Sequence, residues 1–139
     1  MTISKFAGQY DWLSNFYPCN ITYEGISYSS SEHAYQAAKT VDVSERQKIA
    51  GLNSPGAAKK AGRKVSMRPD WDKIKFQVME DILRLKFNGT NQLSILLKST
   101  KNEELVEGNH WHDYVWGVCN GKGQNNLGKI LMKIRGDLG

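Results

Sequence analysis

The feature that most constrains the fold is a long amphipathic segment near the middle of the chain. Apolar residues recur every three or four positions from residue 71 to residue 87, the period of an α-helix with one buried face. Asp70 precedes the segment and can cap its first turn, and Asn88-Gly89 follows it as a helix stop. The pattern predicts a scaffold helix over residues 70–87.

Turn and capping signals divide the rest of the chain into shorter elements. Residues 20–28 predict a hairpin around Glu24-Gly25. Hydroxyl side chains at residues 29–31 can cap a helix over 32–39, and Ser44 can cap another over about 45–52. Further helices are predicted over residues 55–64, 91–99 and 127–138, with Ser54-Pro55 opening the first of them.

Length and composition favour one ordinary domain over residues 1–139. The chain has 40% hydrophobic and 24% charged residues, and no run approaches the roughly 20 apolar residues of a membrane span. The N-terminus lacks the apolar core of a signal peptide. Two cysteines, Cys19 and Cys119, are too few for a disulfide framework. We therefore expect a cytoplasmic protein with reduced thiols and no membrane association.

The positive charge is concentrated in one stretch of the chain. The net charge is +5, but residues 46–69 hold seven basic and no acidic residues, which leaves a balance of −2 elsewhere. Lys60 and Arg63 lie within this stretch, on a predicted helix whose other positions are small. Such a segment favours a local site for an anion. The alternatives are a solvated basic face or a nucleic-acid surface, although no sequence-reading motif accompanies it.

The predicted helix over residues 32–39 can carry catalytic groups. Glu32 and Lys39 are seven positions apart, about two turns, so they share one helix face. A substrate along this face would meet a carboxylate at one end and an amine at the other. The alternative is a solvated helix with ordinary charges.

A second cluster lies in the loop-rich stretch over residues 101–126. Asp113 stands between Trp111 and Trp116, where a carboxylate between indoles could act as a base or bind a hydroxyl group. The alternative is core tryptophans with a loop aspartate that caps nearby amides. His110 and Cys119 raise a metal site as a further alternative, but no metal-binding spacing supports it, and we expect no metal.

The glycine-rich run over residues 121–126 precedes the last predicted helix. Backbone N–H groups at such a helix start can bind phosphate, and the alternative is a flexible glycine turn. Asn126 stands where a dinucleotide-binding loop needs its third glycine, and a P-loop ending is also absent. These departures argue against a dinucleotide oxidoreductase and a nucleoside triphosphatase.

A set of short motifs runs along nearly the whole chain. They are Phe6-Ala7-Gly8, residues 12–17, residues 31–39, Trp71-Asp72 with Met79, Lys86-Phe87, Thr100, residues 105–107, Asp113 with Trp116-Gly117, residues 123–128, and residues 131–135. Taken together and in this order, these motifs resemble those of the NADAR/YbiA-like family. The interval from Glu107 to Asp113 is one residue longer than the usual family pattern, so Asp113 is matched through its distance to Trp116-Gly117.

The resemblance implies an α+β fold, a compact and mostly helical domain with a small antiparallel sheet. It also implies N-glycosidase activity on ribosyl-amine linkages, without a cofactor or an obligate protein partner. Family substrates include phosphoribosylamino-pyrimidine intermediates of riboflavin synthesis and ADP-ribose on guanine bases, as small molecules or attached to nucleic acid. By matched position the catalytic residues would be Glu32, Lys39 and Asp113, and the substrate-binding residues Asn15, Trp71, Trp116 and Asn125.

The substrate chemistry suggests roles for these groups. A ribosyl amine can open its sugar ring to an iminium ion, which a neutral Lys39 can attack to form a Schiff base if its pKa is lowered. Glu32 would move protons, Asp113 would orient a ribose hydroxyl or activate water, and Lys60 and Arg63 would hold phosphate. The alternatives are direct attack by water, or a module that binds ADP-ribose, NAD or a nucleotide without turnover.

Overall fold

The computed structural model describes residues 1–139, and the chain forms two compact units. The central unit is one continuous segment, Asn15–Lys86. The terminal unit combines both ends of the chain, Met1–Ser14 and Phe87–Gly139. None of the helices combines the length and the apolar character that a membrane-spanning helix needs.

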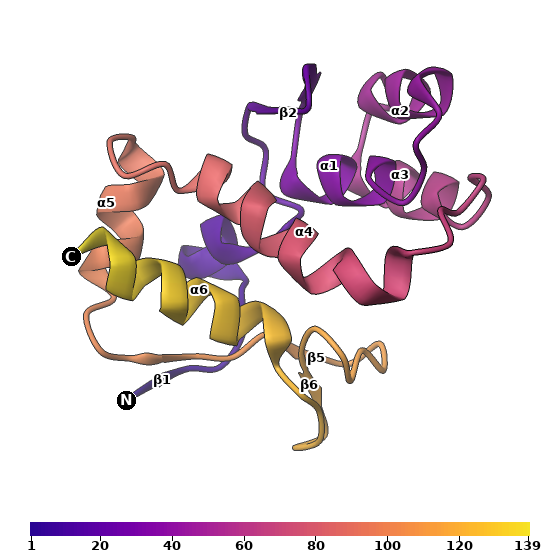
Figure 1. The fold of residues 1–139 in the computed structure, drawn as a ribbon. Coiled ribbons are helices and arrows are strands. Elements are labelled where there is room, and N and C mark those ends of the chain that lie inside the picture. The colour runs from indigo at the N-terminus through magenta and orange to yellow at the C-terminus, as the bar shows by residue number, and fades with distance from the viewer. The chain divides into compact units, whose positions relative to one another are not determined.

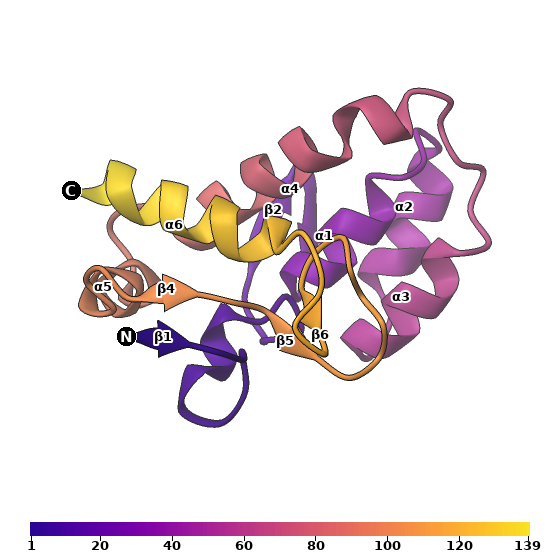
Figure 2. The ribbon, with the colours of Figure 1, turned by 90° about the horizontal axis from the view of Figure 1, so that it is seen from below.

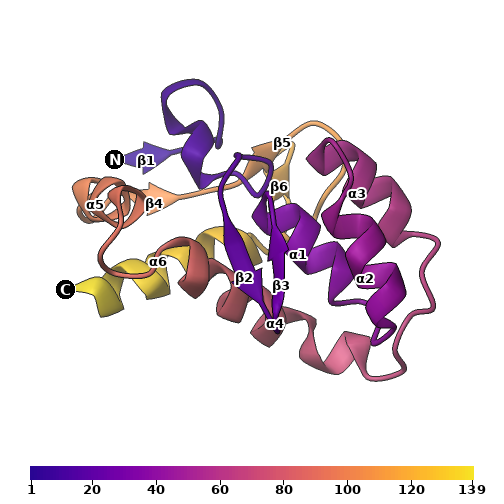
Figure 3. The same cartoon turned by 90° about the horizontal axis from the view of Figure 1, so that it is seen from above.

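The central unit is built around helix α1 (Figure 1). Strands β2 (Ile21–Tyr23) and β3 (Ile26–Tyr28) form an antiparallel hairpin ahead of α1 (Ser31–Ala37). The helices α2 (Val43–Ala50), α3 (Pro55–Gly62) and α4 (Trp71–Lys86) follow. All three pack against α1, and the hairpin contacts α1 as well (Figure 3). Every residue of α1 is consequently buried.

The terminal unit holds two short parallel strand pairs beneath a helix (Figure 2). Strand β1 (Thr2–Ile3) pairs with β4 (Glu104–Leu105), and β5 (Gly108–Asn109) pairs with β6 (Val118–Cys119). The remaining elements are the 3₁₀ helix η1 (Gly8–Leu13) and the helices α5 (Gln92–Ser99) and α6 (Asn126–Leu138). Helix α6 packs on β4 and α5.

The structure confirms the α+β class and the predicted helix over residues 70–87, which is α4. Its apolar stripe is buried as the period requires, with Val78, Met79, Ile82 and Leu83 almost fully covered. The hairpin is the antiparallel sheet that was expected, whereas the two strand pairs of the terminal unit are parallel. Two-residue strands carry too little alternation to be found in the sequence.

Two local predictions were wrong. Ser44 does not cap α2; the cap is Asp42, whose carboxylate accepts a hydrogen bond from the N–H of Glu45. The helix over residues 32–39 ends earlier than predicted, at Ala37, and Lys39 lies in the turn that follows it. Lys39 is therefore presented by a turn rather than by a helix face.

Candidate active site

Helix α1 carries a buried carboxylate in its first turn. Glu32 is 8% exposed, and its N–H donates to the carbonyl of Asn15 at 3.0 Å. The side-chain amide of Gln36, one turn later, donates to Glu32 Oε2 at 2.6 Å. Burying a carboxylate costs free energy unless hydrogen bonds compensate, so a buried Glu32 is not an ordinary surface charge. The alternative interpretation of α1 as a solvated helix is wrong.

Asn15 fixes the start of α1. Its Oδ1 accepts a hydrogen bond from Ser31 Oγ at 2.8 Å, while its own amide nitrogen contacts the Met79 sulfur at 3.6 Å. Together with the bond from the Glu32 N–H to its carbonyl, these contacts tie the segment before β2 to the first turn of α1. The structure thus gives Asn15 a role in orienting Glu32, and its contact with substrate stays a prediction.

Gln36 is in turn fixed by the close approach of helix α3. A Cβ atom added at Gly62 would lie 1.9 Å from Gln36 Oε1 and 2.8 Å from Gln36 Cδ. Ala58 of the same helix is fully buried. The small residues of α3 therefore serve its close packing against α1. The sequence had suggested that they would let this helix approach a polyanion. This packing keeps the Gln36 amide directed at Glu32.

Lys39 follows α1 and is half-buried. Its Nζ lies 5.7 Å from the centroid of the Tyr35 ring. Desolvation lowers the pKa of Lys39, and the cations Arg63, Lys59 and Lys75 lower it further, whereas the charge of Glu32 acts to raise it. A lowered pKa increases the fraction of neutral amine, which is the nucleophilic form. This is the direction of the pKa shift that the Schiff-base hypothesis requires.

An aromatic pair lies behind the Lys39 amine. The rings of Tyr35 and Trp71 are 5.1 Å apart at an angle of 56°. Trp71 is 5% exposed, so it is part of the core of the central unit and supports Tyr35. Its predicted contact with substrate remains untested, and its described role is to stabilise the ring beside Lys39.

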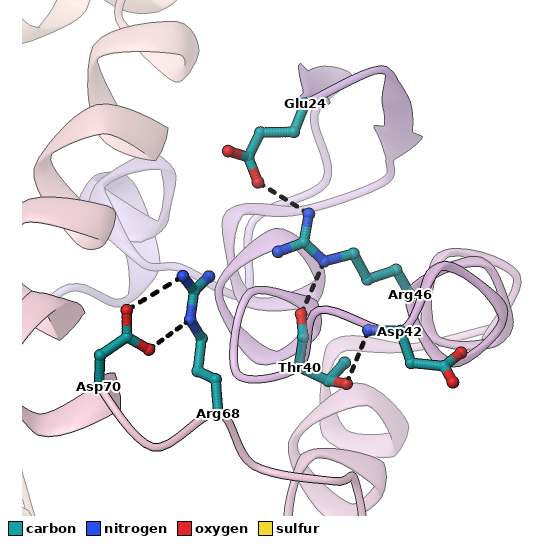
Figure 4. Close-up of polar contacts among 6 residues, drawn as sticks. All are labelled: Glu24, Thr40, Asp42, Arg46, Arg68 and Asp70. Carbon is teal, nitrogen blue, oxygen red and sulfur yellow. Dashed lines mark hydrogen bonds and ion pairs between the residues drawn. The ribbon is translucent and has the colours of Figure 1, made fainter.

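The basic segment of residues 46–69 does not form one cationic surface. Arg46 pairs with Glu24 at 2.7 Å, and Arg68 pairs with Asp70 at 2.7 Å, so both guanidinium groups are engaged in internal ion pairs (Figure 4). Both acidic partners lie outside the segment, Asp70 directly after it and Glu24 22 positions before Arg46, so a count of charges within the segment overstates the free positive charge.

Of the five basic residues outside these ion pairs, four lie on α3 or just after it, and the fifth, Lys48, lies on α2. Lys60 and Arg63 are exposed there, and Arg63 and Lys59 act electrostatically on Lys39. Lys75, from α4, acts on it as well and was not among the predicted residues. Its position four residues after Trp71 is the sequence signal that could have identified it, because i and i+4 share a helix face.

In the terminal unit, Asp113 organises its own loop. Its Oδ1 accepts hydrogen bonds from the N–H groups of Val115 at 3.1 Å and Trp116 at 2.9 Å. The Asn109 side chain holds the Asp113 backbone from both sides, accepting from its N–H and donating to its carbonyl. This is the capping aspartate that the sequence left as an alternative. Asp113 Oδ2 makes no hydrogen bond, so a catalytic role for it stays a prediction, as does substrate binding by the half-buried Trp116.

The start of α6 is not an anion site. The N–H groups of four consecutive residues, 124–127, donate to the carbonyls of residues 114–117. The Asn125 side chain is also engaged, since it accepts from the Glu107 N–H at 3.0 Å and donates to the Leu105 carbonyl at 2.9 Å. The phosphate-binding interpretation of this run is therefore wrong. Asn125 holds β4 against the start of α6, and contact with a substrate remains only a prediction for it.

No group of three or more histidine, cysteine, aspartate or glutamate side chains is placed to hold a metal ion, and both cysteines are free thiols. The central unit instead places a buried carboxylate in the first turn of α1 and an amine of lowered pKa in the turn that follows this helix. This pairing is typical of enzymes that use general acid–base and nucleophilic catalysis.

Comparisons with known proteins also indicate an enzyme. Residues 4–139 match the family model described as the NADAR domain. The chain is 39% identical to the N-glycosidase YbiA of Escherichia coli over 132 residues, which cover 93% of this chain and 82% of that protein. It is also 40% identical to a riboflavin biosynthesis protein of Vibrio vulnificus over 130 residues, covering 91% of this chain but only 35% of the longer relative.

A solved structure supports the same relationship. The solution NMR structure of the Escherichia coli protein YbiA matches with a TM-score of 0.85 at 36% identity, covering 99% of this chain and 83% of that one. The chain belongs to the NADAR domain family. Its curated relatives place it in a group of N-glycosidases, hydrolases that act on N-glycosyl compounds.

Proposed function

We propose that this chain hydrolyses the N-glycosidic bond between a ribose and an exocyclic amine in a phosphate-bearing substrate. The observation that carries the proposal is the lysine of lowered pKa beside a buried glutamate on the same short segment. Two substrates present the required bond: a phosphoribosylamino-pyrimidine, in line with the names of the riboflavin biosynthesis relatives, and ADP-ribose attached to guanine. Exposed cations at Lys60 and Arg63 support a phosphate-bearing substrate of either kind.

The reaction can be written with Glu32 and Lys39 as its working groups. Glu32 donates a proton to the ribose ring oxygen, the bond between this oxygen and C1′ breaks, and the amine nitrogen supplies the electron pair that forms an iminium ion. The neutral amine of Lys39 attacks C1′ to form an aminal, and the Glu32 carboxylate passes a proton from the lysine nitrogen to the substrate nitrogen. The bond between C1′ and the substrate nitrogen then breaks, so the free base leaves and a Lys39 Schiff base remains. Water hydrolyses this Schiff base, which releases the ribosyl product, restores the neutral lysine and returns the proton to Glu32.

Asp113 is proposed as the second carboxylate, on the strength of the motif it shares with the family. Its Oδ1 holds the loop, so Oδ2 is the oxygen that could orient a ribose hydroxyl or activate the water. We also propose that the protein works in the cytoplasm, without a cofactor or an obligate protein partner.

A product assay tests the proposal. Purified protein is incubated in parallel with ADP-ribosylated guanosine and with a phosphoribosylamino-pyrimidine, and release of the free base is followed by mass spectrometry. We expect release from at least one substrate, and a loss of about 10²- to 10⁴-fold in Glu32→Gln. The exposed Glu104 supplies a matched control, and Glu104→Gln should retain full activity.

The same assay separates the competing functions. Tight binding of both substrates with no base released would support a non-catalytic ADP-ribose or nucleotide-binding module and contradict the proposal. Binding to nucleic acid that depends steeply on salt concentration, without release of any small-molecule product, would instead indicate a nucleic-acid-binding protein.

A further inference from the structure

The turn that carries Lys39 is fixed by groups outside helix α1. The Lys39 carbonyl accepts a hydrogen bond from the Arg68 N–H at 2.7 Å. The next carbonyl, that of Thr40, accepts a hydrogen bond from Arg46 Nε at 2.8 Å (Figure 4). Because α1 ends at Ala37, these two bonds supply the anchorage that a continuing helix would otherwise provide.

Arg46 connects this turn to the hairpin. It lies in α2 and is 9% exposed, and its Nη1 donates to Glu24 Oε1 at 2.7 Å. Glu24 occupies the hairpin turn with a left-handed backbone, φ +49°. One guanidinium therefore bridges the Glu24 carboxylate and the Thr40 carbonyl through two different nitrogens.

The Thr40 side chain strengthens the same turn. Thr40 is fully buried; its Oγ1 donates to Glu45 Oε1 at 2.7 Å and accepts from the Asp42 N–H at 3.1 Å. The Glu45 carboxylate also accepts from the Ser66 N–H at 3.2 Å. The backbone after Lys39 thus has little freedom to move.

We propose that Arg46 is a positioning residue for the Lys39 amine, acting through the Thr40 carbonyl and held in place by Glu24. This inference rests on the proposed function, in which Lys39 is the nucleophile. Arg46 does not touch the substrate; it keeps the turn in the conformation that leaves Lys39 half-buried beside Tyr35. A nucleophile misplaced by about 1 Å can lose on the order of a hundredfold in rate.

The charges that face Lys39 come from three helices. They are Glu32 of α1, Lys59 and Arg63 at α3, and Lys75 of α4. A change at residue 46 that conserves its positive charge leaves this set unchanged. A lysine there has a single ammonium that cannot reproduce the two-nitrogen bridge of the guanidinium. Any change in Lys39 that follows Arg46→Lys therefore reports its position and solvation.

The test compares Arg46→Lys with Arg68→Lys. Both variants keep their charge, and both remove a guanidinium that is paired with a carboxylate. Arg68→Lys retains the main-chain N–H that binds the Lys39 carbonyl, so it serves as the matched control. The pKa of Lys39 is read from the ¹³Cε shift of labelled lysine, with Lys39→Met to assign the signal. Base release is measured in parallel across pH.

We expect Arg46→Lys to raise the Lys39 pKa toward its ordinary value. The alkaline rise of the pH–rate profile should move to higher pH with it. The kcat should fall about tenfold to a hundredfold, with a smaller effect on KM. Arg68→Lys should match the wild type in all three measurements. A folded Arg46→Lys with unchanged Lys39 pKa and kcat would overturn the proposal.

Failure of the positioning role and failure of the proposed function give different results. A Lys39 pKa that shifts in Arg46→Lys while base release is unaffected would confirm the positioning and remove Lys39 from the catalytic step. If Arg46→Lys does not fold, Glu24→Gln keeps the shape of the bridge and removes its charge. It should shift the Lys39 pKa in the same direction by a smaller amount, and no shift would count against the proposal.

Discussion

The packing of α3 on α1 makes Gly62→Ala a sharp test of how the carboxylate is held. A Cβ at this position would lie 1.9 Å from Gln36 Oε1, whereas ordinary contacts begin at 3.4 Å. Gln36 is 4% exposed and cannot turn into solvent without opening the helix pair. The amide must leave Glu32, which breaks the 2.6 Å hydrogen bond between them.

The magnitude follows from three contributions. Loss of a hydrogen bond to a charged group costs about 1.5–3 kcal/mol. Crowding in a packed interior costs about 1–3 kcal/mol. Replacing a helical glycine by alanine returns about 1 kcal/mol. The free energy of unfolding of Gly62→Ala should therefore fall by about 1.5–5 kcal/mol, and base release should fall as well because Glu32 loses its orientation.

Gly56 provides the matched control within the same helix, since a Cβ there meets only Ser54 Oγ at 4.0 Å. Gly56→Ala should equal or slightly exceed the wild type in stability. Urea denaturation followed by circular dichroism measures both variants. If Gly62→Ala were as stable and as active as Gly56→Ala, the close packing of Gln36 against α3 would not be what orients Glu32.

Three further predictions concern Lys39 and the terminal unit. The folded-state pKa of Lys39 lies below its ordinary 10.5, so the unfolded chain binds more protons between these two values, and the contribution of Lys39 to stability rises with pH there. Urea denaturation at pH 7 should therefore give Lys39→Met a larger free energy of unfolding than the wild type. This difference should shrink as the pH approaches 10.5. Gly128→Ala would bring a Cβ to 2.0 Å from the Leu105 carbonyl oxygen, so its free energy of unfolding should fall by about 3 kcal/mol or more. In Gly136→Ala, in the same helix, the added Cβ meets no other atom, and the free energy of unfolding should rise by up to about 1 kcal/mol. Asn125→Asp keeps the acceptor but loses the donor to the Leu105 carbonyl, and a thermal melt should show a loss of about 1–3 kcal/mol.

The elements with a long period were predictable from the sequence, and the short ones were not. Helix α4 presents several turns of one buried face, so its position followed from periodicity alone. More than half of the residues of helix α1 are polar, yet all of them are buried by neighbouring elements, which a single-sequence pattern cannot show. Tertiary packing also decided where α1 ends, because Arg68 and Arg46 bind the carbonyls of the turn after it.

The candidate site was also predictable only in part from the sequence. The resemblance identified Glu32 and Lys39, and the chemistry required a lowered pKa for the lysine, but neither showed that Gly62 and Gln36 hold the glutamate. The glycine-rich run before α6 shows the opposite error. Its composition suits phosphate, yet its N–H groups already donate to the carbonyls of residues 114–117. Hydrogen-bond partners distant in sequence are invisible to a motif.

Trapping of the intermediate tests the central claim most directly. The protein is incubated with its substrate and sodium borohydride, digested, and analysed by peptide mass spectrometry. The account predicts a stable ribosyl adduct on the peptide that contains Lys39, formed only with substrate and absent in Lys39→Ala, which should also lose turnover. Full turnover in Lys39→Ala, with no adduct on the wild-type peptide, would contradict it and leave direct attack by water as the route.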